Sequence, residues 1–468
     1  MKSGSDRKAS GDFQTPLSLA RMCCKWLVKL GVNPDVIIEP TCGIGSFLRA
    51  SDEVFPHNPE ILGYEISPHY TVIAQSLNYK FRVKRQDFFS CDWSLELNTY
   101  LDSNSEILFL GNPPWVTISR LTELGYAPDI KRNKGAVFGV GAGINGKSNF
   151  DVSEWMVLKL IDALKSKKGH IALILKESVA RKLIQRIERY NLPIKKISKL
   201  DIDAKKAFEI SVSATMMYFA IGEKAASLTV DEYDKDFNLK TSSLGVRQGR
   251  LVSNAVEFDN YNAHTNSSID PVRRWRSGIK HDCSSVLELS LRDNKLVNKL
   301  GEPVDVESNR VFPLIKGSSV ANHRIEEISK WVIVPKNSLK SPELDIKLHS
   351  PKLWKYLIEH EEYFAKRKSK IYQNGERFPL YGFGEYSFAP WKVATASMYK
   401  RLNFCLVGPM QEKPVFFDDT VYFSAFTSYA EAKKYLDKMK SERASRYLGS
   451  QIFWDNMRPV NREILESV

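Results

Sequence analysis

Four consecutive residues, Asn112, Pro113, Pro114 and Trp115, combine groups that could bind an amino group on a flat ring. The Asn112 side chain and the Pro113 peptide each offer an oxygen, and two oxygens held side by side can accept both hydrogens of one amino group. The Trp115 ring beside them can stack on a base that carries this amino group. A Pro-Pro loop that merely ends a buried strand would explain the prolines, but not the residues on either side of them.

The element that must position these residues is a strand over residues 106–111. Its apolar run, closed by Gly111, is typical of a strand buried on both faces. The two prolines have no N–H to donate to a neighbouring strand, so the strand must end at Asn112. The amide, carbonyl and aromatic groups that follow are therefore expected at the carboxyl edge of a sheet, where α/β proteins bind ligands.

A glycine turn is predicted within residues 35–48, between an earlier strand and a helix. Gly43 and Gly45 carry no side chain that would keep a ligand away from the backbone, as in nucleotide-binding turns. Neither a GxGxxG fingerprint nor a GxxxxGK[ST] P-loop is present. Upstream, Thr15 is a natural N-cap for a helix over residues 17–30, and such a helix start can bind an anion such as a carboxylate.

Acidic residues lie at or just after the ends of two further predicted strands, over residues 61–66 and 81–84. Glu65 follows the glycine turn by about twenty residues, the spacing at which a carboxylate binds ribose hydroxyls in doubly wound folds. Asp87 could accept a hydrogen bond from an adenine amino group, and Phe88 could stack on its ring. An acidic residue at a strand end is often only a cap, but several along one sheet edge favour a nucleoside ligand.

The length and charge of the chain suggest two domains and a polyanionic partner. A chain of 468 residues is too long for one compact core. The net charge is +13, with 30 Lys and Arg against 23 Asp and Glu in residues 1–222, and 38 against 32 in residues 223–468. Two similarly basic halves suit a polyanion that lies between two domains, although a basic surface without a partner would look the same.

Other compositional features exclude several classes. No long apolar run and no signal peptide are present, so we expect a cytoplasmic protein without a membrane span. The six cysteines form no CxxC pair, so we expect neither a zinc site nor a disulfide framework.

Taken in order, these stretches resemble a known family. The chain is similar to the S-adenosylmethionine-dependent amino-methyltransferases and, among them, to the N6-adenine DNA methyltransferases of the TaqI-like, gamma arrangement. Trp115 stands where that family more often has Tyr or Phe, and any of the three rings can stack. The resemblance covers residues 11–222, and its matching stretches are Phe13 to Pro16, Glu39 to Gly45, Tyr64-Glu65, Asp87-Phe88, Asn112 to Trp115, Gly146 to Asp151, Gly169 to Leu175 and Val212 to Phe219.

The resemblance implies a role for each matching position. The cofactor-binding positions would be Thr15 for the methionine carboxylate, the turn residues Glu39, Thr41, Cys42, Gly43 and Gly45, then Glu65 for the ribose, Ile66 against the adenine ring, and Asp87 with Phe88 on that adenine. The catalytic positions would be Asn112 and Pro113 as acceptors of the two N6 hydrogens of the target adenine, Pro114, and Trp115 with Phe219 on either side of its ring.

The resemblance also implies the fold. We expect an α/β, Rossmann-like methyltransferase domain with a mixed sheet over residues 1–222, and a C-terminal α+β target-recognition domain over residues 223–468 that begins with a connector through residue 265. Basic and aromatic residues on glycine-containing loops of the second domain suit contacts with phosphates and base edges, although aromatic clusters more often form a core. The loops concerned are residues 273–282, 313–317 and 377–392.

The implied activity is methylation of adenine at a defined site in DNA. An adenine N6 amine is a poor nucleophile because its lone pair is delocalised into the ring. Two in-plane acceptors favour a geometry that directs this pair at the methyl group of the cofactor. A base paired inside a duplex must first be rotated out of the stack. Cytosine C5 methylation requires a Pro-Cys motif, which is absent.

Two other functions share parts of this pattern. Asn-Pro-Pro-aromatic also occurs in enzymes that methylate glutamine amides in proteins, but those chains are shorter, carry Tyr and lack a large basic second domain. A non-catalytic DNA-specificity subunit could keep the fold, but it would need neither the cofactor pattern nor Asn112. The implied partners are double-stranded DNA and a cognate restriction endonuclease or other defence-system subunits.

Overall fold

The computed structural model divides the chain into two compact units, Met1–Val256 (unit 1) and Glu257–Val468 (unit 2). The residues described are 11–77, 79–98, 105–123, 125, 150–241, 243–262, 274–326, 328–336, 343–372 and 377–468. Among these residues, no helix is both long enough and apolar enough to span a membrane.

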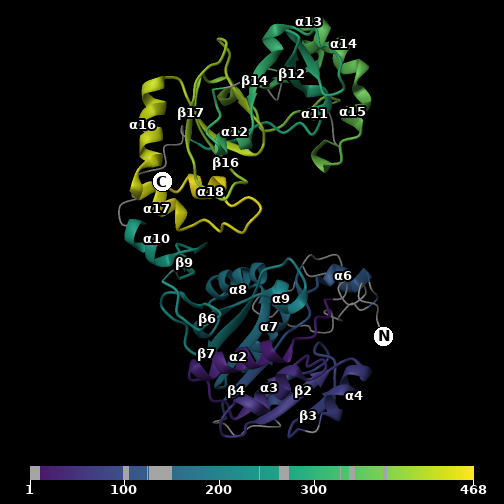
Figure 1. The fold of residues 1–468 in the computed structure, drawn as a ribbon, viewed down its shortest axis with the longest axis vertical. Coiled ribbons are helices and arrows are strands. Elements are labelled where there is room, and N and C mark those ends of the chain that lie inside the picture. Colours follow the sequence, from purple (N-terminus) through teal and green to yellow (C-terminus); the bar gives the residue numbers. More distant parts are fainter. Residues whose placement is uncertain are drawn as a thin grey trace. The chain divides into compact units, whose positions relative to one another are not determined.

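Unit 1 is built around an eight-stranded sheet (Figure 1). In spatial order its strands are β3 (Arg82–Arg85), β2 (Glu60–Glu65), β1 (Val36–Glu39), β4 (Ile107–Gly111), β5 (Gly169–Lys176), β7 (Ala214–Ile221), β6 (Ile194–Ile202) and β8 (Val230–Tyr233). Only β7 is antiparallel to its neighbours in this sheet. The predicted mixed α/β sheet is confirmed. The direction in which successive strands are added reverses between β1 and β4, and ligands of such folds bind at the carboxyl ends of the two strands on either side of this point.

Helices cover both faces of this sheet. Four helices share a core with one face, and their bounds are α2 (Leu17–Lys29), α3 (Ser46–Val54), α4 (Pro68–Ser76) and α9 (Ala204–Phe208). Two further helices, α7 (Val152–Leu164) and α8 (Glu177–Arg189), pack on β5, and α8 also packs on β7. The short helices are α5 (Trp93–Asn98), beside α7, and α6 (Ile118–Glu123). The helix and strand predicted over residues 17–30 and 106–111 are confirmed as α2 and β4.

The end of unit 1 differs from the predicted boundary at residue 222. After Gly222 the chain returns to the sheet as β8, which lies parallel to β6. It then forms a hairpin of β9 (Gly245–Arg247) and β10 (Arg250–Val252) that packs on α8. The segment expected to be a connector therefore completes the first unit, because its apolar positions are buried against the sheet and α8.

Unit 2 contains two sheets with helices, so the predicted α+β class is confirmed (Figure 1). The first sheet has the order β11 (Arg276–Ser277), β19 (Val421–Phe426), β16 (Trp391–Ala396) and β17 (Cys405–Val407). The second has the order β13 (Lys295–Asn298), β12 (Glu288–Arg292), β15 (Trp331–Ile333), β14 (Val311–Ile315) and β18 (Phe416–Phe417). The helices are α10 (Ala255–Asn262), which crosses the boundary, α11 (Ser284–Leu287), α12 (Gly317–Ala321), α13 (Glu343–His349), α14 (Pro351–Glu359), α15 (Glu361–Ala365), α16 (Tyr429–Lys440), α17 (Glu442–Gly449), α18 (Arg462–Leu465) and the 3-10 turns η1 (Ser308–Arg310), η2 (Lys370–Tyr372) and η3 (Glu385–Phe388).

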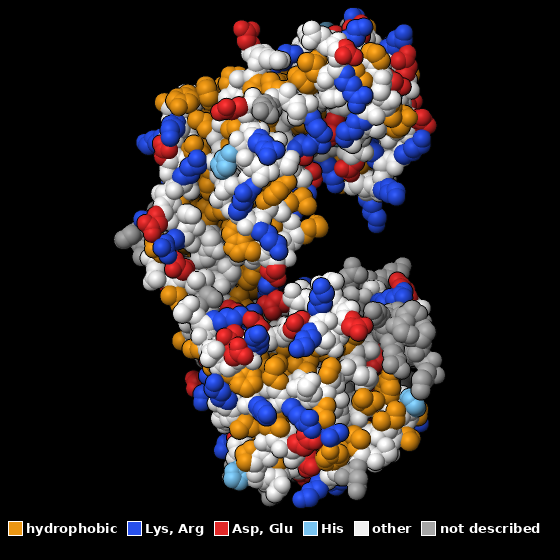
Figure 2. Space-filling view, in the orientation of Figure 1, with side chains coloured by type: hydrophobic (Ala, Val, Ile, Leu, Met, Phe, Trp, Pro, Cys, Tyr) orange, Lys and Arg blue, Asp and Glu red, His pale blue; other side chains and the backbone are white. Residues whose placement is uncertain are grey.

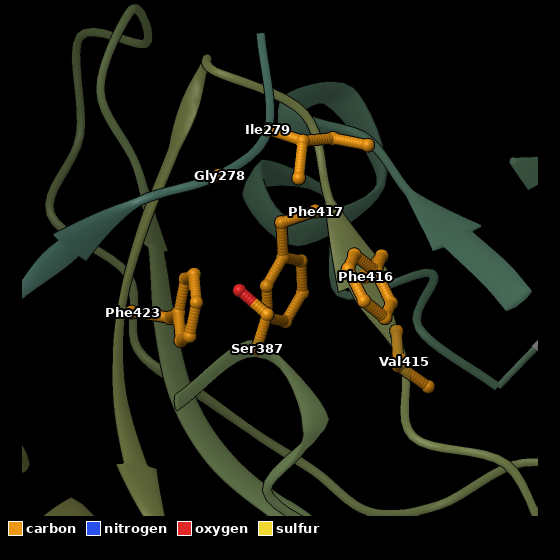
Figure 3. A pocket seen from close by; sticks show the side chains of 7 residues that line it. All are labelled: Gly278, Ile279, Ser387, Val415, Phe416, Phe417 and Phe423. Carbon is orange, nitrogen blue, oxygen red and sulfur yellow. The ribbon is translucent and has the colours of Figure 1, made fainter. Parts of the chain in front are cut away.

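The two sheets of unit 2 meet at a tightly packed joint (Figure 3). The rings of Phe417 and Phe423 lie 5.2 Å apart, and Ser387 points toward them. The backbone at Gly278 passes the backbone at Asp418 so closely that an added Cβ at Gly278 would lie 2.1 Å from the Asp418 carbonyl oxygen. The joint holds no space for a water-sized molecule, so it fixes the two sheets together and is not a ligand site.

Much of the sequence expected to contact DNA instead forms the core of unit 2. Trp275, Phe378, Phe383 and Lys392 are all buried, and residue 273 lies outside the described residues. Gly278, Gly317 and Gly382 lie where another segment passes closely, since an added Cβ would come within 2.5 Å of it. The expectation that Trp275, Phe378 and Phe383 face a nucleic acid is therefore wrong, because each ring fills the interior between sheets and helices.

Candidate active site

Asn112 lies directly after β4 and carries an oxygen without a partner. Its Nδ2 donates a hydrogen bond to the Phe13 carbonyl at 3.1 Å. Among the described residues, no donor reaches its Oδ1, which is shielded from solvent. Pro113 is buried and Pro114 half-buried, so the strand ends here as predicted. The hydrogen bond to Phe13 orients the amide and leaves its oxygen as a fixed acceptor.

Trp115 is held as rigidly as Asn112. Its indole Nε1 donates to the Ile174 carbonyl at 3.2 Å, and its backbone N–H donates to the Gly11 carbonyl at 3.3 Å. Its ring centroid lies 5.7 Å from that of Phe13 and 5.3 Å from that of Phe208. An aromatic group of three rings from distant parts of the chain therefore adjoins Asn112.

Phe219 is not part of this group, contrary to the sequence prediction. It is fully buried in β7, between Ile171 of β5 and Ile197 of β6. Because β7 runs antiparallel, its first residue, Ala214, lies at the carboxyl edge beside Lys176, and Phe219 lies toward the opposite edge. Phe208, the last residue of α9, precedes β7, and its ring lies beside that of Trp115.

The glycine turn after β1 is closed by side chains from two other segments. Gly43 and Gly45 have φ angles of 52° and 87°, which favour glycine. Glu65 accepts the Gly43 N–H at 2.8 Å, and Gln14 accepts the Ile44 N–H at 3.1 Å. An added Cβ at Gly43 would lie 2.4 Å from Gln14 Oε1, so a side chain there would displace the Gln14 amide from the turn.

Further buried polar atoms around this turn lack partners among the described residues. These atoms are Glu39 Oε2 and Thr41 Oγ1. Glu39 Cγ lies close to Gly111, since an added Cβ there would be 3.1 Å from it, which places the carboxyl next to the end of β4. Cys42 instead packs its sulfur toward Gly63, and its backbone N–H and carbonyl already bond the Tyr64 carbonyl and the Gly45 N–H. Unsatisfied buried atoms of this kind fit a polar ligand that completes their hydrogen bonds.

A pocket of about 370 Å³ opens beside the turn, where α2 and α3 begin. It is lined by Gln14, Thr15, Pro16, Leu17, Ile44, Gly45, Ser46, Arg49 and Leu77. The N-cap of α2 is Pro16, not Thr15 as predicted, because the first residue with helical backbone is Leu17. Thr15 nevertheless lines the pocket at the start of a helix, the end that attracts a carboxylate.

The predicted adenine-binding residues after β2 and β3 divide into two kinds. Ile66 is 58% exposed and Asp87 half-buried, so a ligand can reach both. Asp87 Oδ1 accepts the Phe89 N–H at 3.0 Å. Phe88 is buried against Phe89 and Trp93, as Trp115 and Phe208 are buried in their own cluster, and its stacking on a ligand stays a prediction. Asp151, from the matching stretch 146–151, caps α7, and residues 146–149 lie outside the described residues.

We expect Glu39 to make the stability of the ligand-free protein depend on pH. Burial raises the pKa of this carboxyl well above its ordinary value of 4.5. The associated stability is complete below pH 4.5 and is lost as the pH rises through the folded-state pKa. Glu39→Gln cannot ionise, so its melting temperature relative to wild type should be higher at pH 8 than at pH 5. Parallel melting curves of the two proteins across pH would contradict this.

The reversed β7 separates this sheet from the all-parallel dinucleotide-binding folds and defines unit 1 as a Rossmann-like methyltransferase domain. No protein-family model matches the chain. The Type II methyltransferase M.NspV of Nostoc sp. is 40% identical over 465 residues, which cover 98% of this chain and 95% of that protein. The chain therefore belongs to the Type II methyltransferase family, whose methyl donor is S-adenosylmethionine.

Solved structures resemble the chain more distantly. The Type IIL restriction-modification enzyme MmeI, solved in complex with DNA, is 13% identical, with a TM-score of 0.48 over 90% of this chain and 60% of that one. A type I restriction-modification methyltransferase subunit from Streptococcus thermophilus is 18% identical, with a TM-score of 0.33 over 48% of this chain and 47% of that one.

Proposed function

We propose that the protein methylates N6 of an adenine that is rotated out of duplex DNA at a defined site, as an enzyme of the gamma arrangement. The observation that carries this proposal is the fixed and unpartnered Asn112 Oδ1 at the carboxyl edge of the sheet. Together with the Pro113 carbonyl it forms a pair of acceptors suited to one exocyclic amino group. The adjacent indole of Trp115 suits the ring that carries this group.

The side chains at this edge divide the chemistry between them. Asn112 and Pro113 accept the two N6 hydrogens and so localise the lone pair of the amine. Trp115 stacks on one face of the purine, which offsets part of the cost of unstacking it from the duplex, and Phe208 supports the Trp115 ring through an edge contact at 5.3 Å. These groups position and polarise the nucleophile and form no covalent bond with it.

The cofactor-binding positions fit S-adenosylmethionine, which supplies a methyl group activated by its sulfonium. Thr15 and the start of α2 would hold the carboxylate, and the turn from Glu39 to Gly45 would surround the amino-acid end, where Glu39 and Thr41 have unsatisfied atoms. Glu65 would bind the ribose hydroxyls. Ile66 and Asp87 are open to the adenine.

Unit 2 is proposed to read the DNA sequence, within a restriction-modification system. Figure 2 shows Lys and Arg side chains scattered over the visible face of both units, with acidic side chains between them. In unit 2 the loop between β16 and β17 carries the exposed Lys400 and Arg401. Arg401 donates to the neutral Asn322 rather than to a carboxylate, so its charge remains available to phosphates.

Replacing Lys400 and Arg401 together by alanine should weaken DNA binding and flatten its salt dependence. The plot of log K against log salt has a negative slope, and each lost phosphate contact reduces the magnitude of this slope by roughly 0.9. Binding of duplex DNA measured at several salt concentrations tests this. Lys433→Ala is the matched control, because this lysine already pairs with Asp437 at 2.6 Å. An unchanged slope in the double variant would remove this loop from the DNA surface.

Expression in a methylation-free host, followed by sequencing of its genome for modified bases, tests the proposed function. We expect N6-methyladenine at one short sequence motif throughout the genome. An unmodified genome in cells that contain folded protein would contradict the proposal. Methylated glutamine in host proteins would instead favour the amide-methylating alternative.

A further inference from the structure

The segment of residues 11–16, here called the N-terminal strap, touches both halves of the candidate active site. On the base-binding side, the Gly11 carbonyl accepts the Trp115 N–H and the Phe13 carbonyl accepts Asn112 Nδ2. The Phe13 ring lies 5.7 Å from the Trp115 ring and 6.0 Å from the Phe208 ring. The strap therefore orients the amide that is proposed to bind the target amine.

On the cofactor side, a chain of side-chain hydrogen bonds ties the strap to the glycine turn. Gln14 Oε1 accepts the Ile44 N–H at 3.1 Å, and Gln14 Nε2 donates to Asp12 at 2.7 Å. Tyr70 of α4 donates to the other oxygen of Asp12 at 2.9 Å. Gln14 also lines the 370 Å³ pocket, so a ligand there contacts the strap directly.

The two sets of contacts come from adjacent residues. Phe13 fixes Asn112 through its carbonyl, and Gln14, its neighbour, fixes the turn through its amide. A peptide unit is planar, so rotating the Gln14 backbone moves the Phe13 carbonyl with it. The Gln14 N–H and the Phe13 carbonyl therefore share one rigid unit, and any shift of the Gln14 backbone at the glycine turn also shifts the acceptor of the Asn112 amide.

We propose that the strap couples the two sites energetically, with Gln14 as the positioning residue that transmits the coupling. This inference rests on the proposed function. Occupation of the cofactor pocket holds Gln14 against Ile44, which holds the Phe13 carbonyl in place and keeps Asn112 Oδ1 aimed at the base. Coupling of this kind is reciprocal, so DNA tightens cofactor binding by the same factor.

The test compares binding of two probes to the full-length protein. The probes are S-adenosylhomocysteine and sheared genomic DNA from a methylation-free host. For wild type, we expect saturating S-adenosylhomocysteine to lower the Kd for DNA by about 5- to 150-fold, the usual range of such couplings. For Gln14→Ala we expect this factor to fall close to one, with kcat reduced more than KM is raised.

A matched control and a milder variant separate coupling from general damage. Gln75→Ala removes an exposed glutamine that donates to the Val83 carbonyl outside the strap, and it should keep the wild-type factor. Tyr70→Phe removes only the hydrogen bond from Tyr70 to Asp12, so it should reduce the effect of S-adenosylhomocysteine on the Kd for DNA only in part. This variant replaces Gln14→Ala in the test if Gln14→Ala does not fold.

Three results would overturn the proposal. The first is that S-adenosylhomocysteine leaves the Kd of wild type for DNA unchanged. The second is that it lowers the Kd of Gln14→Ala for DNA by the same factor as in wild type. The third is that Gln14→Ala binds both probes equally more weakly while their coupling remains intact. Failure of the proposed function looks different, because wild type would then transfer no methyl group to the genomic DNA, whatever the binding data show.

Discussion

Asn112→Ala is expected to lower the rate of methylation by at least about 10²- to 10³-fold, the usual effect of removing one oriented hydrogen-bonding group from an active site. The reason is that Oδ1 is an aligned and unpartnered acceptor, whereas alanine leaves the amine bound only by the Pro113 carbonyl. Transfer of labelled methyl groups to DNA measures the rate. Calorimetry with S-adenosylhomocysteine should give an affinity near that of wild type, since Asn112 does not line the cofactor pocket.

Asn238→Ala is the matched control for this experiment. Its amide donates to Asp234 at the surface of unit 1, so its removal should change neither rate nor affinity. Simultaneous loss of methylation and cofactor binding in Asn112→Ala, with the fold intact, would mean that Asn112 belongs to the cofactor site instead.

Phe208→Ala and Phe219→Ala should fail in different ways. Phe208 packs edge-on against Trp115, the ring proposed to stack on the base. Stacking of a base on an aromatic ring is worth about 1–3 kcal/mol, so Phe208→Ala, which removes the support of that ring, should lower kcat/KM by up to roughly 5- to 150-fold. Phe219 is fully buried in the sheet, and its truncation should cost about 3–5 kcal/mol of the free energy of unfolding. Urea unfolding and steady-state kinetics of both variants separate the two effects.

The reverse pattern would restore the role that the sequence first suggested for Phe219. That pattern is a stable but inactive Phe219→Ala protein beside an active Phe208→Ala protein. A 2-aminopurine base in place of the target adenine offers a second measure, since loss of a stacking ring should raise its fluorescence.

Local sequence patterns were sufficient to predict the strand end and the glycine turn of the candidate site. The strand that ends at Asn112 follows from an apolar run stopped by two prolines, and both causes lie within a few residues. Likewise, Gly43 and Gly45 adopt the left-handed backbone that only glycine tolerates well. The helix at residues 17–29 was predictable from its apolar spacing, although its cap lies one residue later than expected.

Features that depend on distant parts of the chain could not be predicted in this way. The orientation of Asn112 depends on a carbonyl in the N-terminal strap, and nothing near Asn112 in the sequence indicates this partner. Phe219 and Phe208 are distinguished only by the antiparallel direction of β7. The aromatic Phe88 is buried because Trp93 folds back over it. The end of unit 1 depends on β8, whose pairing with β6 crosses the predicted boundary.

Mass spectrometry of nucleosides tests the central claim most directly. The purified protein is incubated with duplex DNA from a methylation-free host and S-adenosylmethionine that carries a deuterated methyl group, and the DNA is then digested. We expect the label in N6-methyladenine. Label in a methylated cytosine, or none in DNA while the protein binds both ligands, would contradict the role assigned to Asn112 and its neighbours.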